Sequence, residues 1–451
     1  MKPTRRDLLW LAAGGLACRS GRPEARVIPS RIRLPERFVT TLPIPALLAS
    51  YDISVREADA HILPDLATRI WGYGGTFPGP LIEARRGQEI RLRLRNELAV
   101  PIVNHLHGGR TPPASDGYPT DFVRPGETRE YVYPNQQRAA TLWYHDHRMD
   151  HTAPQVWRGL AGMYILRDEE ETALPLPRGA REIPLILCDR SFDSDGSLLY
   201  PENRHEYMGG VLGDVVLVNG APWPKLEVAN VRYRFRILNA SNARRYELSL
   251  PHGFVQIGSD GGLLAAPAPL RSLRIAPAER FDVIVDFSKY PIGSVVTMGD
   301  VMQFHIARPE RDETAIPSRL ANLPPLNERD AVTTRIFDFA YQRSTGSWTI
   351  NGKPFDQDRM DARPRLGSTE IWQLQTDFSH PLHLHLVHFR VLSHSGRPGP
   401  FDAGYKDTID LGPGEAARIL VRFDGYKGRY VFHCHNLEHE DMAMMGNFEV
   451  V

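Results

Sequence analysis

The sequence predicts an all-β chain built from three repeated sandwich domains. Glycine and proline occur 37 times each among 451 residues, and many short runs alternate apolar with polar side chains. Such alternation is typical of strands with one buried face, and Gly- and Pro-containing connections are typical of the turns between them. A turn-and-strand pattern also recurs along the chain, which indicates repetition of one structural unit.

The recurring pattern is a Pro-Xaa-Glu turn followed by an alternating strand. The turn begins at Pro125, Pro277 and Pro413. The strands that follow are predicted at 128–132, 280–287 and 416–423. An earlier strand recurs in the same way, at 85–96, 230–239 and 367–374. Each unit therefore contains the same two strands in the same order.

Two segments without periodicity separate the three units. Residues 167–181 and 307–331 are charged and proline-rich, which is typical of linkers. The domains are accordingly predicted at 45–167, 182–307 and 332–451, and residues 21–45 are expected to run over the surface. The chain length fits about three domains. We expect no helix longer than a few turns.

The N-terminus, residues 1–20, has the pattern of an export signal. Arg5 and Arg6 precede an apolar run, 8–17, that is too short to span a bilayer. Twin arginines in this place are typical of the twin-arginine route, so we expect a protein of the periplasm or the extracellular space. Cys18 is either lipidated or lost with the leader, and the preceding Gly-Leu-Ala favours its loss.

Charge and cysteine content narrow the classes of partner. Lys and Arg together number 54, as do Asp and Glu, so the formal net charge is zero. Nothing favours nucleic acid or an anionic membrane, and we expect a monomer without a membrane span. Cys188 follows an apolar strand and is expected to be a buried thiol, so no disulfide is expected in the mature chain.

The metal-binding residue types are concentrated near the C-terminus. Residues 428–432 read as a strand that leads into His433-Cys434-His435. Because successive strand side chains point to opposite faces, Cys434 faces one way and both histidines face the other. One tripeptide therefore suffices to serve two metal sites. Electrons can then pass between the two sites through a few covalent bonds.

A thiolate, two imidazoles and a distant thioether form a blue-copper site. Cys434, His439 and Met444 follow one another at the spacing that such a site requires, and His380 supplies the second imidazole. Met442 and Met445 flank Met444 and are expected to be packing residues. An axial Met predicts a low to middle reduction potential.

Four His-x-His pairs supply eight further imidazoles. They are His105/His107, His145/His147, His383/His385 and His433/His435. Eight imidazoles exceed the needs of one mononuclear site, so a metal cluster is predicted. The equivalent point in the middle unit, Thr297, has no such pair, which makes the middle domain a spacer. The ligands should then meet between the first and third domains.

These motifs together resemble those of the multicopper oxidases. His-Leu-His-Gly, Trp-Tyr-His-Asp-His, His-Pro-Leu-His-Leu-His and His-Cys-His-x-x-x-His-x-x-x-x-Met occur in this order. The resemblance covers nearly all of the chain after the leader. The surroundings at 143–153 are most similar to the bilirubin oxidase and spore-coat laccase branch. The resemblance implies three consecutive cupredoxin-like Greek-key β-sandwich domains.

The resemblance also implies four copper ions and a ligand set for each. His380, Cys434 and His439 would bind the type 1 copper, with Met444 axial. His105 and His383 would bind the type 2 copper. The type 3 pair would be bound by His107, His145, His147, His385, His433 and His435.

Two carboxylates resemble the proton-relay acids of the family. Glu440 directly follows a ligand, and Asp116 follows the His-Leu-His-Gly motif. Asp116 is also compatible with a simple turn role, since Asp-Gly is a turn dipeptide. Asp146, between two ligands, should face the opposite side of its strand. Among the remaining histidines, only His151 and His388 lie close to the motifs.

The predicted function is an exported oxidase that takes single electrons from a small donor and reduces dioxygen to water. The resembling branch oxidises phenols, aromatic amines and bilirubin-like tetrapyrroles. Cuprous ion is the alternative donor, with a role in copper tolerance, but no Met-rich insertion is present. A copper-free cell-division scaffold is disfavoured because the ligand set is complete. A nitrite reductase of the two-domain type is disfavoured because it lacks the four pairs.

Overall fold

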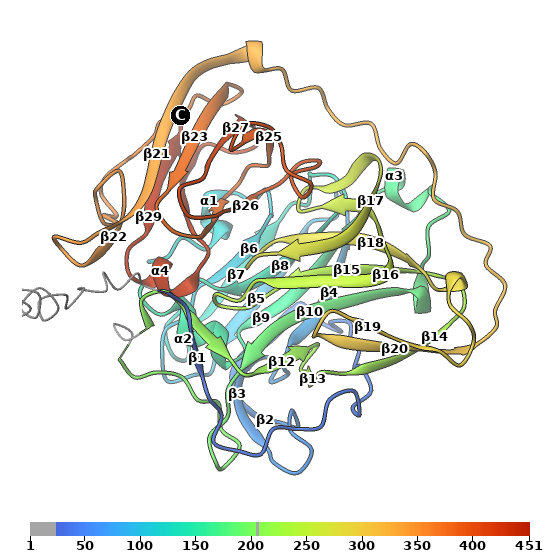
Figure 1. The fold of residues 1–451 in the computed structure, drawn as a ribbon. Helices are drawn as coiled ribbons and strands as arrows, with labels where there is room; N and C mark the ends of the chain where they lie inside the picture. Colours follow the sequence, from blue (N-terminus) through green and yellow to red (C-terminus); the bar gives the residue numbers. More distant parts are fainter. Residues whose placement is uncertain (1–23, 204–206) are drawn as a thin grey trace, which may run out of the picture.

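The computed structural model describes residues 24–203 and 207–451 (Figure 1). The predicted export signal and Cys18 lie outside the described residues. The prediction of an all-β chain is confirmed, because strands form seven sheets and the longest described α-helix has 7 residues. In the described part of the chain, no helix has the length and apolar character needed to cross a bilayer.

The first sandwich packs sheet β3-β2-β5-β7 against sheet β4-β9-β8-β6. Its strands are β2 (Asp52–Ala60), β3 (Thr68–Tyr73), β4 (Gly79–Arg85), β5 (Ile90–Asn96), β6 (Asn104–His107), β7 (Thr128–Tyr133), β8 (Ala140–Asp146) and β9 (Ala161–Arg167). In β5 every second side chain is buried, and the intervening arginines face solvent. The short helices α1 (Pro113–Asp116) and α2 (Thr152–Arg158) lie in its connections.

The middle sandwich has the seven-stranded sheet β13-β12-β10-β15-β18-β16-β17 and the three-stranded sheet β14-β20-β19. Its strands are β10 (Glu182–Arg190), β12 (Val215–Val218), β13 (Ala221–Pro222), β14 (Lys225–Ala229), β15 (Arg232–Asn239), β16 (Tyr246–Ser259), β17 (Gly262–Ile275), β18 (Arg280–Asp286), β19 (Val295–Met298) and β20 (Met302–Arg308). A separate pair, β1 (Arg26–Ile28) and β11 (Val211–Gly213), ties the N-terminal segment to this domain. The 3-10 turn η3 (Phe287–Lys289) follows β18.

The third sandwich packs sheet β22-β21-β23-β27-β25 against sheet β26-β24-β28-β29. Its strands are β21 (Ala331–Gln342), β22 (Ser347–Ile350), β23 (Thr369–Thr376), β24 (His380–Leu384), β25 (Phe389–His394), β26 (Thr408–Leu411), β27 (Ala416–Arg422), β28 (Gly428–Cys434) and β29 (Met445–Val450). Helix α4 (Leu437–Asp441) joins the last two strands. In Figure 1 this sandwich is orange to red, and the middle one is green to yellow.

The sequence repeat corresponds to one antiparallel strand pair in each sandwich. These pairs are β5–β7, β15–β18 and β23–β27. The middle residue of each Pro-Xaa-Glu turn has a positive φ, 81° at Gly126, 71° at Ala278 and 73° at Gly414. Glycine adopts this conformation without strain, which explains its presence in two of the three turns.

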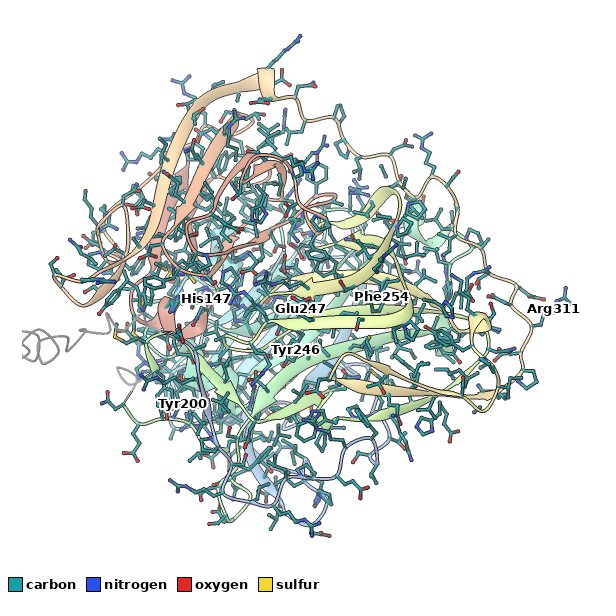
Figure 2. All side chains as sticks on the ribbon, in the orientation of Figure 1. His147, Tyr200, Tyr246, Glu247, Phe254 and Arg311 are labelled. Carbon is teal, nitrogen blue, oxygen red and sulfur yellow. The ribbon has the colours of Figure 1, made fainter. Side chains whose placement is uncertain are left out.

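The two predicted linkers differ in structure. Residues between β20 and β21 form an outer loop that ends in the 3-10 turn η4 (Glu328–Asp330), and Figure 2 shows Arg311 pointing away from the body. The first linker contains η1 (Gly179–Arg181) and a helix that the sequence did not indicate, α3 (Glu169–Thr172). Asp168 caps α3 by accepting from the Glu171 amide at 2.8 Å, so a short polar helix is stabilised locally.

Candidate metal centre

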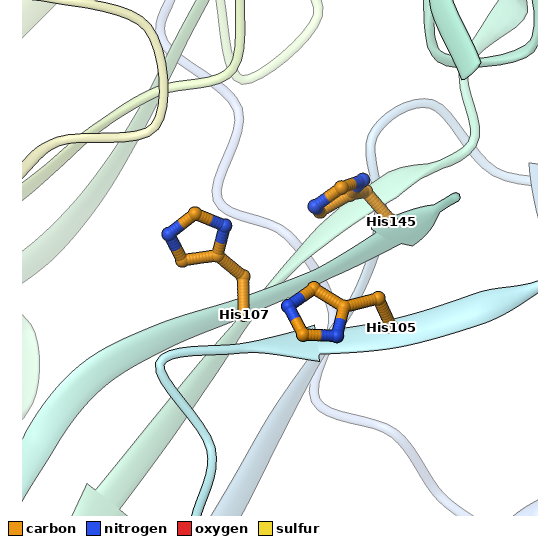
Figure 3. Close-up of side chains that lie close together, drawn as sticks. All are labelled: His105, His107 and His145. Atoms are coloured by element: carbon orange, nitrogen blue, oxygen red, sulfur yellow. The ribbon is translucent and has the colours of Figure 1, made fainter. Parts of the chain in front are cut away.

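Two pairs of neighbouring strands bring the predicted ligands together. In the first sandwich β6 and β8 are antiparallel neighbours, with His105 opposite His145. In the third sandwich β24 and β28 are antiparallel neighbours, with His383 opposite His433. All eight imidazoles of the His-x-His pairs are buried. Figure 3 shows the rings of His105, His107 and His145 gathered over adjoining strands.

The imidazoles form groups that span the first and third sandwiches. Ligand-type atoms lie within 4.8 Å of one another in His105/His107/His145, in His105/His383/His385 and in His147/His385/His433. The last two groups each combine residues of both sandwiches. The predicted meeting of ligands between the end domains is therefore present in the structure.

In the first group, each ring has one nitrogen engaged and the other free. The Nδ1 atoms of His105 and His145 donate to the carbonyls of Asp116 and Asp146 at 2.5 and 2.8 Å. The Nε2 atoms of both rings are buried without a partner. A buried nitrogen lone pair without a partner is costly unless a ligand satisfies it. Burial also lowers the pKa of both histidines, which favours the neutral, metal-binding form.

In the third group, His147/His385/His433, three nitrogens converge on one point. The Nε2 atom of His433 lies 3.2 Å from the Nε2 atoms of both His147 and His385. The opposite nitrogens of two rings are engaged, since His385 Nδ1 donates to Asp116 Oδ2 at 2.8 Å and His433 Nδ1 to the Cys434 carbonyl at 3.1 Å. His147 Nδ1 lies 3.5 Å from Glu440 Oε1. A bound metal ion would satisfy three lone pairs that cannot all pair with one another. Residues of this kind fit copper.

A separate cluster holds the thiol. Cys434 Sγ lies 3.3 Å from His380 Nδ1 and 3.5 Å from His439 Nδ1, and the two nitrogens are 3.1 Å apart. Met444 is buried beside them, because its amide donates to the His439 carbonyl at 3.0 Å and its carbonyl accepts from the Cys434 amide at 3.1 Å. Burial raises the pKa of the Cys434 thiol, so a thiolate here requires a positive partner such as a metal ion.

The imidazoles of the thiol cluster are held from behind. Asp377 Oδ1 lies 3.3 Å from His380 Nε2. The ring of Trp348 stacks on His439 with centroids 3.9 Å apart and planes at 29°. Trp348 is fully buried, and sequence reasoning missed it because β22 carries no metal-binding motif. These contacts fix ring orientation without a metal ion, which preorganises the site.

Glu440 and Asp116 both lie against predicted ligands. Glu440 Oε2 is 3.1 Å from His433 Nδ1, and its Oε1 accepts from the Thr152 hydroxyl at 2.7 Å. Burial alone would raise the pKa of Glu440, but the adjacent His147 and His433 lower it below the usual range. Burial raises the pKa of Asp116 well above its usual value.

Asp116 also ends α1, and Gly117 follows it with φ 79°. The turn role and the contact with a ligand are therefore compatible.

The other flanking residues have packing or structural roles. Asp146 Oδ1 accepts from the Val103 amide at 2.9 Å, so its carboxylate supports the backbone. Met445 is buried in a small cluster with Tyr118, and Met442 packs against the hydrophobic core of the third sandwich. His151 precedes α2 and is exposed.

Asp407 is a residue near the ligands that sequence reasoning missed. Its Oδ1 accepts from His107 Nε2 at 3.0 Å, and its carbonyl accepts from His383 Nδ1 at 2.9 Å. His388 Nε2 lies 3.6 Å from its Oδ2. No spacing in the sequence links Asp407 to His107, which lies 300 positions away. Asp407 precedes β26 of the third sandwich and His107 ends β6 of the first, so packing between these two sandwiches brings them together.

Comparisons with known proteins point to one family. Models of the multicopper oxidase family match residues 54–171, 198–311 and 328–451. A laccase of Bacillus subtilis (strain 168) is 38% identical, over 92% of this chain and 98% of the laccase. A bilirubin oxidase of Albifimbria verrucaria is 37% identical, over 88% of this chain and 76% of the oxidase. A solved structure of a multicopper oxidase from Campylobacter jejuni, described as a metallo-oxidase, superposes with a TM-score of 0.82 at 25% identity. The match covers 95% of this chain and 98% of that protein.

Proposed function

The chain belongs to the multicopper oxidase family, and from that premise we propose that it is an exported laccase-type enzyme with four copper ions. As a family member it is a copper oxidoreductase that uses dioxygen. The proposed donors are phenols, aromatic amines or bilirubin-like molecules, each giving up one electron at a time. The proposed ligands are the ten histidines, Cys434 and Met444 named above, and the proposed state is a monomer.

The observation that carries the proposal is the position of the His433-Cys434-His435 tripeptide. The Cys434 sulfur belongs to the thiol cluster, whereas His433 Nε2 lies among the imidazoles that converge from the other sandwich. Copper supplies one-electron redox chemistry when it is bound. The chain supplies the short covalent route between the two sites. It also excludes water from both sites, since the ligands are buried.

Reduction of dioxygen to water consumes protons as well as electrons. Glu440, a carboxylate between the Thr152 hydroxyl and the His433 ring, is proposed to accept a proton and pass it on. Asp116 is proposed to do so at Oδ2, against His385. Burial favours a protonated Asp116, and the two carboxylates approach the imidazoles from different elements, α4 and α1. Two independent proton carriers fit a reaction that takes up several protons.

Organic donors are favoured because the relatives with the higher identity are named laccase and bilirubin oxidase. One observation supports the cuprous alternative. The Met208 sulfur lies 3.8 Å from the Tyr341 hydroxyl, and the Tyr341 ring packs on Trp348 at 5.0 Å. Trp348 in turn stacks on His439, so a soft thioether lies near the thiol cluster. Cuprous ion prefers such ligands.

Export by the twin-arginine route rests on Arg5, Arg6 and the apolar run after them. Secretion in a host with this route, and its loss in the Arg5→Lys, Arg6→Lys double variant, would test that part. Export unchanged in the double variant would contradict it.

The donor class is tested by dioxygen uptake of the copper-loaded protein, with a phenol and with cuprous ion in parallel. Fast uptake with the phenol and slow uptake with cuprous ion is the expected result. The reverse would assign the chain to copper tolerance. A protein that binds no copper and consumes no dioxygen would be a scaffold instead.

A further inference from the structure

Arg280, at the start of β18 in the middle domain, is buried where the three domains meet. Its guanidinium has five N–H donors, and every one has an acceptor. Nε donates to the Thr141 carbonyl at 2.9 Å, in the first domain. Nη1 and Nη2 donate to the carbonyls of Ala278 and Asp260 at 2.9 and 3.3 Å, in the middle domain. The remaining two donors bind both carboxylate oxygens of Asp407, in the third domain.

Asp407 in turn holds two predicted copper ligands. Its Oδ1 accepts from His107 Nε2 at 3.0 Å, and its carbonyl accepts from His383 Nδ1 at 2.9 Å. The two rings stack with centroids 3.6 Å apart and planes at 17°. The opposite nitrogens, His107 Nδ1 and His383 Nε2, are buried without a partner. Asp407 therefore sets which nitrogen each ring presents to a metal ion, together with the Thr408 hydroxyl, which donates to Asp407 Oδ1 at 2.9 Å and lies 3.2 Å from His107 Nε2.

The glycine of the His-Leu-His-Gly motif leaves space for this ion pair. Gly108 has φ +80°, and a Cβ there would lie 2.6 Å from Arg280 Nη2 and 2.8 Å from Asp407 Oδ2. Any larger residue would displace the guanidinium or the carboxylate. The strand end that carries His107 is thus shaped around the ion pair.

A second buried charge cluster supports Asp407 from the middle domain. Asp260 Oδ2 lies 3.3 Å from the amides of both Asp407 and Thr408, which donate to it. Lys406 Nζ lies 3.2 Å from the same oxygen and 3.1 Å from Glu279. All of these side chains are buried, so their mutual attraction is weakly screened. The backbone that presents Asp407 is therefore held firmly.

We propose that Arg280 is a positioning residue of the trinuclear copper site and acts through Asp407. The inference rests on the ligand set of the proposed function. The guanidinium fork holds the carboxylate so that it accepts the His107 Nε2 proton, which leaves Nδ1 for copper. The middle domain, without a ligand in its described residues, thereby controls copper binding in the other two.

The test is Arg280→Lys, which keeps the charge but loses the two-pronged geometry. Loss of a partner behind a metal-bound histidine typically weakens metal affinity by about 10–100-fold. We expect that loss at the trinuclear site, with the type 1 site unchanged. The measurement is copper retained per chain during titration with a chelator. Type 1 copper is followed by its blue absorption, and type 2 copper by paramagnetic resonance.

Arg234→Lys is the matched control. Arg234 lies in the same domain and is also buried. Its Nε donates to Asp282 Oδ1 at 2.9 Å, and this pair lies away from the predicted ligands. This variant should keep trinuclear copper at the wild-type affinity. Equal loss in both variants, or full retention in Arg280→Lys, would overturn the proposal. A wild-type chain without copper would instead refute the proposed function.

Asp407→Asn is a second variant that tests the proposal if Arg280→Lys does not fold. It keeps the shape of the side chain but removes the charge, so it should give a blue protein with weakened trinuclear copper. A blue Asp407→Asn protein with wild-type trinuclear affinity would overturn the proposal. Failure of both variants to give any blue protein would also overturn it, because the network would then serve folding alone.

Discussion

Glu440→Gln should slow dioxygen reduction without disturbing the type 1 site. Glu440 Oε2 lies 3.1 Å from His433 Nδ1, and its Oε1 accepts from the Thr152 hydroxyl at 2.7 Å. Glutamine has the same shape, and its amide can keep the contact with Thr152. It cannot carry a proton, so the variant removes one function and little structure.

The expected size of the effect follows from the surroundings of Glu440. Proton transfer by a positioned side chain contributes about 10²–10⁴-fold to a rate. Asp116 offers a second carboxylate at His385, 2.8 Å away, and is not altered. We therefore expect the low end, a fall of about 100-fold in turnover.

The assay separates the two half-reactions. Donor is first added without dioxygen, and the rate at which the blue colour bleaches should match that of the wild type. Dioxygen is then added, and the return of the colour should be about 100-fold slower. Reoxidation at the wild-type rate would refute the assignment of Glu440 as a proton carrier.

Asp441→Asn is the control, one residue further along α4. Its carboxylate accepts from the amides of Thr152 and Ala153 at 2.8 and 3.0 Å, at the start of α2. Asparagine keeps only one acceptor oxygen for these two amides, so the variant should cost about 1 kcal/mol of stability. Turnover should stay within about two-fold of the wild type, because a capping change of this size leaves the catalytic groups in place.

Three further predictions concern other residues. Cys434→Ser should abolish the blue colour and donor oxidation but leave trinuclear copper loadable; equal loss of all copper would contradict the two-site assignment. Asp116→Asn should lower the rate of dioxygen reduction by about 10²-fold or more. A variant that reduces dioxygen at the wild-type rate would show that Asp116 has only a turn role. His394 lies between two carboxylates that raise its pKa to about 9. Because the folded pKa is raised, His394→Gln should cost about 1 kcal/mol below pH 6.5 and nothing once the pH exceeds about 9; a pH-independent difference in unfolding free energy would contradict this.

The strand pattern and the clustering of the metal-binding residue types could be predicted because both depend on local spacing. Alternation along 428–434 places Cys434 and His433 on opposite faces, and the structure has them in different clusters. The repeated turns predicted the first residue of β7, β18 and β27, and each predicted end differs from the observed one by a single residue. These features follow from the two-residue period of side chains along a strand and from the Pro-Xaa-Glu turns that precede the strands.

Other parts of the site depend on packing between domains and leave no trace in local spacing. Arg280 and Asp407 are 127 positions apart, and neither belongs to a metal-binding motif. The free nitrogen of each imidazole depends on acceptors such as the Asp116 carbonyl, which sequence does not locate. Trp348 reaches His439 only because the hairpin β21–β22 folds against α4. Helix α3 was missed because it is short and polar, with a local cap.

The proposed function is tested most directly by the number of donor molecules oxidised per dioxygen consumed. A one-electron phenolic donor and the copper-loaded protein should give a ratio of about four, with water as the product, because four electrons reduce dioxygen to water and the Cys434 route joins the two sites. A ratio of about two, with hydrogen peroxide as the product, would refute the proposed function, since two electrons reduce dioxygen only to peroxide and the imidazoles would then not act as one cluster.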